Sequence, residues 1–333
     1  MKTFRFRTCI AVLLAAAMLT CLASACKPAE KTATVRLCEV THSVFYAPQY
    51  VALQLGFFEE EGLKVELSTG EGADRVMAAV LSGGIDIGFA GPEAAIYVYN
   101  EGRDNYAQVF AQLTRRDGSF LVARKPDTAF SWDKLKGAHV LPGRVGGVPY
   151  MTFCHVLRQN GLDLTRDLTL DTSVQYALMT AAFTSGTGDY VTVFEPTAST
   201  LEKNGQGYIV ASVGEAAGDI PYTAYFASRE YLTKNADTAE RFTRAIYRGQ
   251  QWVAAHTAEE IAKAVQPSFP DADLDSLTRS IRSYQRIDAW CTDPLLRPEA
   301  FDRLQEVIRE AGELDKKAPY DPVVNTRFAE AVC

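Results

Sequence analysis

A strand–helix alternation that runs once from residue 34 and starts again near residue 132 constrains the fold of this 333-residue chain more than any other feature. Short apolar stretches typical of buried strands lie at 35–40, 65–67, 86–90, 138–141, 168–171 and 190–194. Stretches typical of helices lie among them, at 48–56, 73–81, 93–100, 149–160 and 174–183. Because this repetition predicts mostly parallel sheets covered by helices on both faces, we expect an α/β protein with two lobes.

Two further pairs of strands predict how the chain passes between the lobes. Strands at 106–113 and 119–124 lead out of lobe 1, and strands at 208–211 and 222–227 lead back. After residue 227 the pattern is helical only, at 239–256, 273–284 and 298–311, which indicates a helical C-terminal region. We therefore expect crossings near 121–124 and 222–226, with lobe 1 at 34–123 and 225–333, lobe 2 at 124–224 and a ligand cleft between them.

The first 25 residues, 1–25, have the pattern of an export signal peptide. A basic start at 1–7 precedes an apolar run at 9–22 that is too short to span a bilayer comfortably. The signal ends in Ala23-Ser24-Ala25-Cys26, small residues before a cysteine, which resembles the lipobox of bacterial lipoproteins. The resemblance implies lipid attachment at Cys26, a polar tether at 26–33 and a location on the extracytoplasmic face of the bacterial cytoplasmic membrane. Cleavage without lipid attachment is the alternative.

Charge and cysteine content exclude several classes of protein. Loss of Lys2, Arg5 and Arg7 with the signal takes the formal net charge from −7 to −10, and no Lys/Arg-dense stripe remains, so we expect no nucleic-acid partner. The cysteines in the body of the chain are Cys38, Cys154, Cys291 and Cys333. Because they have neither CxxC pairs nor the Cys/His spacing of a zinc site, we expect no metal, no cofactor and reduced thiols, with Cys38 in a buried strand.

Loops at the carboxyl ends of the predicted strands form the candidate site, because open α/β sheets bind their ligands there. These loops lie at 41–47, 91–93, 143–149, 173–176 and 195–196. The candidate ligand residues from the loops and from the second crossing are His42, Ser43, Phe45, Tyr46, Glu93, Gly143, Arg144, Gly146, Gly147, Gln175, Tyr176, Glu195, Tyr222 and Tyr225.

Three motifs resemble the substrate-binding proteins of ABC importers, in the branch for thiamine-pyrimidine precursors, sulfonates and nitrate. They are THSVFYAPQYVA (41–52) with GFFEEEGL (56–63), AAVLSGGIDIG (78–88) and FEPTA (194–198). The resemblance implies a bilobed periplasmic-binding-protein fold of type II and a monomer that is not an enzyme. It also implies a small-molecule ligand captured by lobe closure, with ABC permease and ATPase subunits as partners.

Carboxylates and aromatic rings in the candidate loops indicate the class of ligand. Ionised Glu93 and Glu195 can only accept hydrogen bonds, which favours an exocyclic amine or a protonated ring nitrogen over an anion. The aromatic residues that can stack on a flat ring are Phe45, Tyr46, Tyr176, Phe194, Tyr222 and Tyr225. We therefore expect a nitrogen-bearing heterocycle, with a thiamine-type aminopyrimidine favoured and flavin-like or purine-like rings as alternatives.

Several alternatives stay open at this point. Glu195 also fits a helix-start carboxylate facing the helix dipole, and one of Phe45 and Tyr46 also fits a core position. The glycine loop at 143–147 fits either a tight turn or, together with Arg144, an anion site for a sulfonate or nitrate. A pyrimidine-synthesising enzyme of the same fold and a sensory lipoprotein are the remaining alternative functions.

Overall fold

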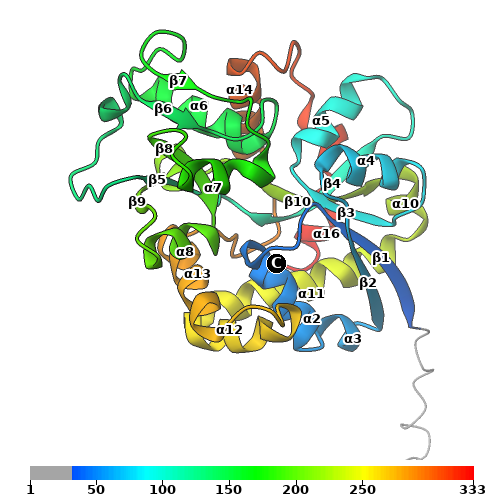
Figure 1. Cartoon of the computed structure of the whole chain (residues 1–333). Coiled ribbons are helices and arrows are strands. Elements are labelled where there is room, and N and C mark those ends of the chain that lie inside the picture. The colour runs from blue at the N-terminus through cyan, green and yellow to red at the C-terminus, as the bar shows by residue number, and fades with distance from the viewer. Residues whose placement is uncertain (1–31) are drawn as a thin grey trace, which may run out of the picture. The chain divides into compact units, whose positions relative to one another are not determined.

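Two five-stranded mixed sheets organise the computed structural model, which describes residues 32–333 except the side chain of Tyr176 (Figure 1). Sheet A has the order β2(Leu63–Thr69), β1(Ala33–Glu39), β3(Ile87–Ala90), β10(Thr223–Ser228), β4(Ala107–Thr114). Sheet B has the order β7(Thr169–Leu170), β6(His139–Leu141), β8(Tyr190–Phe194), β5(Ser119–Ala123), β9(Tyr208–Ser212). The predicted signal peptide, Cys26 and the tether up to residue 31 lie outside the described residues.

The sheets differ from the mostly parallel prediction in a specific way. β1 pairs with β3, and β6 pairs with β7 and β8, in parallel. In contrast, β10 runs antiparallel to β3 and β4, and β5 runs antiparallel to β8 and β9. The prediction was wrong for β5 and β10 because each enters its sheet from the other sheet, and not through a strand–helix–strand unit within its own sheet, the connection that joins parallel neighbours.

The positions of the crossings also differ from the prediction. β5 lies in sheet B, although the sequence analysis assigned residues 119–123 to lobe 1. The first crossing is therefore at 115–118 rather than near 121–124, and the second is at 213–222 rather than near 222–226. The strand pattern alone does not encode which sheet a strand joins, so an apolar strand beside a crossing fits either side.

Helices cover both sheets. Those that contact sheet A or one another beside it are η1(Val44–Tyr46), α2(Ala47–Gln54), α3(Phe57–Glu60), α4(Ala73–Leu81), α5(Glu93–Asn100), α10(Arg229–Lys234) and α11(Ala236–Ala255). Those in the sheet B part of the chain are η2(Trp132–Leu135), α6(Val148–Gln159), α7(Tyr176–Thr184), α8(Thr197–Lys203) and α9(Val213–Ala217).

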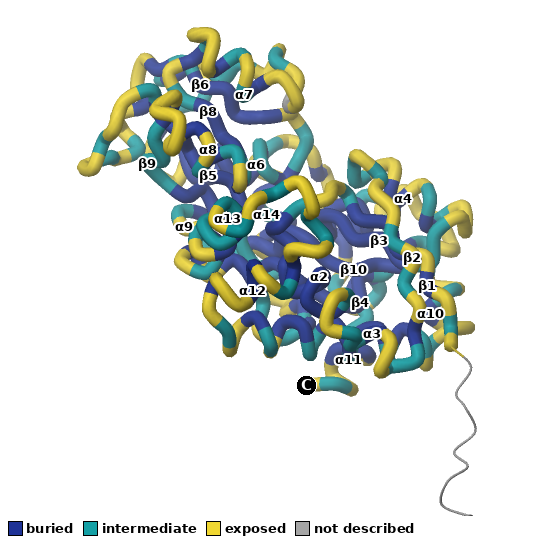
Figure 2. Tube along the Cα trace, turned by 60° about the horizontal axis from the view of Figure 1, so that its bottom comes forward, coloured by how far each residue is buried: buried dark blue, intermediate teal, exposed yellow. Residues whose placement is uncertain are grey.

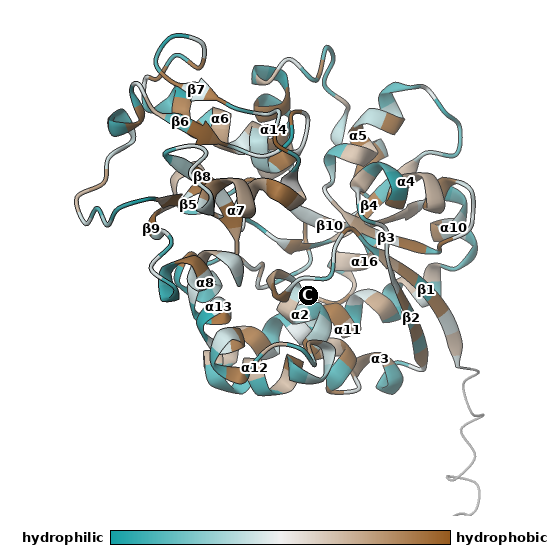
Figure 3. Cartoon of the chain, in the orientation of Figure 1, coloured by the Kyte–Doolittle hydropathy of each residue, from teal (hydrophilic) through white to brown (hydrophobic). Residues whose placement is uncertain are grey.

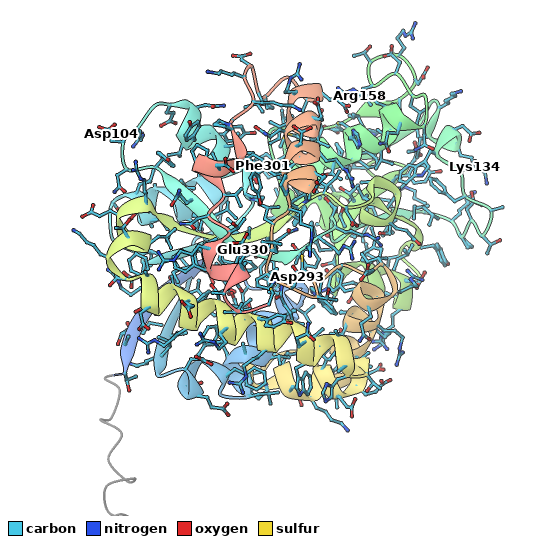
Figure 4. All side chains as sticks on the ribbon, turned by 180° about the vertical axis from the view of Figure 1, so that it is seen from behind. Asp104, Lys134, Arg158, Asp293, Phe301 and Glu330 are labelled. Carbon is cyan, nitrogen blue, oxygen red and sulfur yellow. The ribbon has the colours of Figure 1, made fainter. Side chains whose placement is uncertain are left out.

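The helical C-terminal region touches elements of both sheets. It consists of α12(Ala258–Val265), η3(Gln266–Ser268), α13(Leu274–Arg286), α14(Pro298–Glu310), α15(Tyr320–Val323) and α16(Arg327–Glu330). α13 packs on α12 and also contacts α8, and α14 contacts both α5 and α6. Figure 4, seen from behind, shows α14, marked by Phe301, between the cyan and green parts of the chain. The C-terminal region therefore lies against both sheets and does not belong to one alone.

The hydrophobic core lies along the strands of the two sheets. Strands of both sheets are buried and outer loops and helix turns are exposed (Figure 2), and apolar residues gather in strands such as β3 and β5 (Figure 3). Cys38 is buried in β1 as predicted, and it is free, as are Cys154, Cys291 and Cys333. Within the described residues, no helix is long and apolar enough to span a membrane.

Hydrogen bonds and ion pairs join the two crossings. The Thr223 amide donates to the Thr114 hydroxyl at 2.8 Å, and the two threonine hydroxyls contact each other. Beside them, Arg116 Nε lies 3.0 Å from Asp219 Oδ1, which links the first crossing to the second. Gly214 of the second crossing packs so closely on the first that an added Cβ would lie 2.0 Å from the Asp117 carbonyl oxygen. The crossings therefore form one tightly packed joint.

We predict that Gly214→Ala destabilises the protein. The new methyl group would overlap the Asp117 backbone, and overpacking of this kind typically costs about 1–3 kcal/mol in the free energy of unfolding. Gly84→Ala is the matched control, because the atom nearest to its added Cβ lies at 3.5 Å, an ordinary contact. Urea unfolding of both variants checks this, and equal stability of the two would contradict the close packing of the joint.

Candidate functional site

The candidate loops follow the strands that the sequence predicted for them. η1 and α5 begin directly after β1 and β3, which are parallel neighbours in sheet A. α6, α7 and α8 follow β6, β7 and β8, which are parallel neighbours in sheet B. Because parallel strands end at the same edge of a sheet, the loops of each sheet share one edge, as the prediction required.

An aromatic cluster joins a loop of sheet A to a strand of sheet B. The ring of Phe45 lies 4.8 Å from that of Tyr284, 5.6 Å from that of Tyr222 and 6.1 Å from that of Phe194. Phe45, Tyr46 and Tyr284 are buried, and Phe194 at the end of β8 is half-buried. The structure therefore brings Phe45, Phe194 and Tyr222 together, and adds Tyr284 from the C-terminal region, which the sequence analysis did not select.

Tyr225 lies apart from that cluster, in the core of sheet A. Its ring stacks on Phe89 at 4.4 Å, and its hydroxyl donates to Gln49 Oε1 at 3.0 Å. Gln49 in turn donates to Glu39 Oε2 at 2.8 Å. Tyr225 thus supports a buried polar network at the end of β1.

This network centres on Glu39, a fully buried carboxylate that the sequence analysis did not select. Tyr50 donates to Glu39 Oε2 at 2.7 Å, and His42 Nδ1 lies 2.9 Å from Glu39 Oε1. Burial raises the pKa of Glu39, while hydrogen bonds from Tyr50, His42 and Gln49 lower it in part. His42 Nε2 contacts the Ser268 carbonyl at 2.8 Å, so both ring nitrogens have protein partners. His42 therefore has a local hydrogen-bonding role in this network, and its ligand role stays a prediction.

The two predicted carboxylates have different surroundings. Both oxygens of Glu195 accept hydrogen bonds from Ser199, from its amide at 3.0 Å and from its hydroxyl at 2.7 Å. Glu195 therefore caps the start of α8, and its backbone amide donates to the Tyr284 hydroxyl at 3.1 Å. A ligand role for Glu195 stays a prediction beside this structural one.

Glu93, at the start of α5, is the carboxylate that lacks such partners. Its Oε2 is buried and has no hydrogen-bond partner among the residues described. Burial raises the pKa of Glu93 to about 7, and its own backbone amide and the positive charge of Arg144 lower it only in part. The carboxylate folds over Gly91, where an added Cβ would lie 1.9 Å from Oε2. A buried acceptor without a donor costs free energy, so the site favours a ligand that brings an N–H group.

The glycine loop of sheet B carries the charged candidate residue Arg144. Gly143 and Gly146 have positive φ angles, as a tight turn requires, and Arg144 and Val145 between them are exposed. Gly147 is the N-cap residue of α6. The positive charge of Arg144 favours the ionised form of Glu93 and so lowers its pKa in part.

The remaining predicted residues, Ser43, Gln175 and Tyr176, lie at the starts of η1 and α7. Ser43 Oγ accepts a hydrogen bond from the Phe45 amide at 3.2 Å and so caps η1. Gln175 is the exposed N-cap residue of α7, and the side chain of Tyr176 lies outside the description. Their ligand roles stay predictions. In residues 32–333 no group of His, Cys, Asp and Glu side chains is arranged to hold a metal ion.

A separate recess of about 330 Å³ lies beside the joint between the crossings. Its lining includes Arg115 and Asp219, which pair with each other, and Arg297 and Asp293, whose charged atoms are 2.9 Å apart. These charges already have partners, and none of the described residues that line the recess has a buried polar side-chain atom without a hydrogen-bond partner.

Comparison with known proteins assigns the chain to a family. A family model described as NMT1-like matches residues 28–266, more than two thirds of the chain. The chain belongs to the NMT1-like family. Within this family, it is 46% identical over 309 residues to YtlA of Bacillus subtilis (strain 168), whose name describes a candidate binding protein. That match covers 93% of this chain and 92% of the relative.

Solved structures confirm the fold of this NMT1-like protein. The alkanesulfonate-binding protein SsuA of Xanthomonas axonopodis, bound to MOPS, aligns with a TM-score of 0.69 and 17% identity over 90% of this chain and 100% of that one. A Candida albicans protein described as having the generic periplasmic binding protein fold aligns with a TM-score of 0.65 and 17% identity, over 88% of this chain and 96% of that one. The predicted periplasmic-binding-protein fold is therefore confirmed.

We predict that Glu93→Gln changes how stability depends on pH. The pKa of Glu93, about 7 in the folded protein, exceeds its ordinary value of 4.5, so ionising Glu93 costs stability as the pH rises from about 4.5 to about 7. The amide introduced by the substitution would not ionise, and the variant should gain on the order of 3 kcal/mol relative to the wild type across this window. Urea unfolding near pH 5 and pH 8 measures this gain.

The control for this measurement is Glu101→Gln, which removes an exposed carboxylate just beyond the other end of α5. We expect its stability relative to the wild type to be nearly constant with pH. A constant difference for Glu93→Gln as well would show that Glu93 ionises normally in the folded protein.

Proposed function

We propose that this protein is the extracytoplasmic solute-binding component of an ABC importer, which captures a small nitrogen-bearing heterocycle and delivers it to a permease. The family, the relative named as a binding protein and the fold shared with solute-binding proteins support this role. A thiamine-type aminopyrimidine is the ligand we favour. The single observation that carries this choice is the buried Oε2 of Glu93, which accepts no hydrogen bond within residues 32–333.

Ligand binding would proceed by closure of two lobes built on sheets A and B. Glu93 belongs to the sheet A side and the glycine loop to the sheet B side. A ligand would therefore contact Glu93 and the loop at the same time only in a closed form. A ligand that gains both sets of contacts shifts the population toward that form. The amine or protonated ring nitrogen of the ligand would donate to Glu93, and rings of the Phe45 cluster would flank the heterocycle.

A sulfonate or nitrate is the second candidate, and Arg144 with the glycine loop favours it. The structural neighbour from Xanthomonas axonopodis is an alkanesulfonate-binding protein. Against an anion stands Glu93, whose ionised carboxylate would repel it, with Arg144 as the compensating cation. The charge of the ligand therefore separates the two candidates.

A thermal-shift and calorimetric panel on the full chain tests the proposal. The panel holds 4-aminopyrimidines, thiamine, flavins, purines, taurine, MOPS and nitrate. A ligand at about 100 times its Kd should raise the unfolding free energy by about 2.7 kcal/mol. We expect stabilisation by an aminopyrimidine. Stabilisation by MOPS, taurine or nitrate alone would replace this proposal with the anion site at the glycine loop.

Glu93→Gln should weaken binding of an amine-bearing ligand from the panel by about 1–3 kcal/mol, the range for a hydrogen bond to a charged group. Glu101→Gln again serves as the matched control and should bind as the wild type does, since it is exposed and pairs with Arg103. Isothermal titration calorimetry measures both. Unchanged affinity in Glu93→Gln would remove Glu93 from the site.

The proposal includes attachment to the membrane through a lipid on Cys26. Cys26→Ser removes the thiol that would carry the lipid, so the protein should move from the membrane fraction to the soluble fraction of the producing cells. Cys38→Ser, a change in a buried strand, is the control and should leave the distribution unchanged. Membrane association that survives Cys26→Ser would exclude lipid anchoring at this residue.

A further inference from the structure

The chain that follows α14 crosses from the sheet B side to the sheet A side of the site. Its start is held on α6, where His155 Nδ1 lies 2.6 Å from Glu310 Oε2. Gln159 approaches the other ring nitrogen of His155 through its amide nitrogen at 2.8 Å, so Nδ1 carries the hydrogen and donates to Glu310. The far end of this segment is held on α5, where the side-chain amide of Asn100 donates a hydrogen bond to the Lys316 carbonyl at 2.7 Å. We call residues 310–316 the C-terminal strap.

Glu313 lies in the middle of this strap, opposite the glycine loop. Its carboxylate is 3.9 Å from the position that a Cβ on Gly146 would occupy. Burial raises the pKa of Tyr150, on the first turn of α6, to about 12, and the nearby charge of Glu313 contributes to this rise. The strap thus places a carboxylate beside the same loop that carries Arg144.

The negative charges of Glu93 and Glu313 both raise the pKa of the same residue, Tyr97. Burial raises the pKa of Tyr97 on α5, and the negative charges of Glu93 and Glu313 raise it further. Arg144 is exposed and lies between Gly143 and Gly146 on the facing loop. The candidate site therefore has two carboxylates, Glu93 on α5 and Glu313 on the strap, and the glycine loop supplies a single guanidinium, that of Arg144.

A second observation, the burial of Glu93, supports a ligand in this region. Glu93 is only 7% exposed, and its Oε2 finds no donor in the part of the chain that the structure describes. An exposed acidic cluster would be satisfied by solvent, whereas a buried carboxylate oxygen needs a donor from another molecule or a costly protonation.

We infer that Glu313 is a specificity-determining residue of the ligand site, and that with Glu93 it selects a ligand carrying a protonated amine in addition to its ring nitrogens. This inference rests on the proposed function and narrows its ligand class from heterocycles in general to cationic ones. The residue comes from beyond 266, where the match to the family model ends. The C-terminal region would therefore add a specificity contact to the binding site of this protein.

A pair of probes that differ in charge tests the inference. Both carry a 4-amino-2-methylpyrimidine ring, one with a hydroxymethyl arm and the other with an aminomethyl arm that is protonated near neutral pH. Calorimetry on the full chain should show about 10-fold tighter binding of the aminomethyl probe. Glu313→Gln should abolish that preference, weakening the aminomethyl probe about 10-fold and the hydroxymethyl probe less than about 2-fold.

Glu313 and Asp315 are both exposed carboxylates of the strap, and Glu313 is the one that lies near Gly146. Asp315→Asn is therefore the matched control, because it removes the same charge two residues along the strap. We expect it to leave the preference intact, and melting curves should show all variants folded. If Glu313→Gln weakened both probes equally, Glu313 would act only by stabilising the closed form against Arg144 and not by contacting the amine of the ligand. That result would overturn the inference.

The remaining outcomes separate the inference from the proposed function. Equal binding of the two probes by the wild type, with both weakened by Glu93→Gln, would overturn the inference and leave the proposed function standing. Binding of neither probe by the wild type would overturn both.

Discussion

The hydrogen-bonded contact between Thr114 and Thr223 is the constraint on which the rest of the structure depends. The two threonines stand where the chain leaves sheet A and where it returns, so their contact fixes the two crossings side by side. Asp117, in the first crossing, is buried, and its Oδ1 accepts a hydrogen bond from the Ser119 amide at 2.7 Å. Burial raises the pKa of Asp117 to about 6. A joint so closely packed allows little sliding, and relative motion of the sheets would have to be a rotation about it.

Charge is distributed unevenly between the joint and the site. In the joint, Arg115 and Arg116 pair with Asp219 and Asp288. At the candidate site, Glu93 is buried, and the exposed Arg144 is the cation that lowers its pKa in part. Both regions also contain a buried carboxylate oxygen without a hydrogen-bond partner among the described residues, Asp117 Oδ2 in the joint and Glu93 Oε2 at the candidate site. In the proposed function, a donor from the ligand would relieve the free-energy cost at Glu93.

The fold was more predictable from the sequence than the site, because local signals define helices whereas distant neighbours define burial. α4 and α5 match their predicted spans, since apolar spacing and following glycine or polar residues define them. The directions of β5 and β10 were predicted wrongly, because the sequence of an apolar strand does not indicate which strand it pairs with. The sequence located Glu93 after a predicted strand, but it did not reveal that Phe45 and Tyr225 are both fully buried, Phe45 in the cluster with Tyr284 and Tyr225 against Phe89. Glu39 and Glu313 gave no local signal, because their neighbours come from distant parts of the chain.

The C-terminal strap also bears on how far the sheets can separate. A fully extended chain spans at most about 3.3–3.6 Å per residue, so the six steps from Glu310 to Lys316 reach about 20 Å. While His155 holds one end and Asn100 the other, the separation of α6 and α5 is limited to this reach plus the lengths of the connecting Glu310, His155 and Asn100 side chains. The strap is thus a tether with a fixed maximum length, and it sets an upper bound on the size of a solute that enters without breaking either contact.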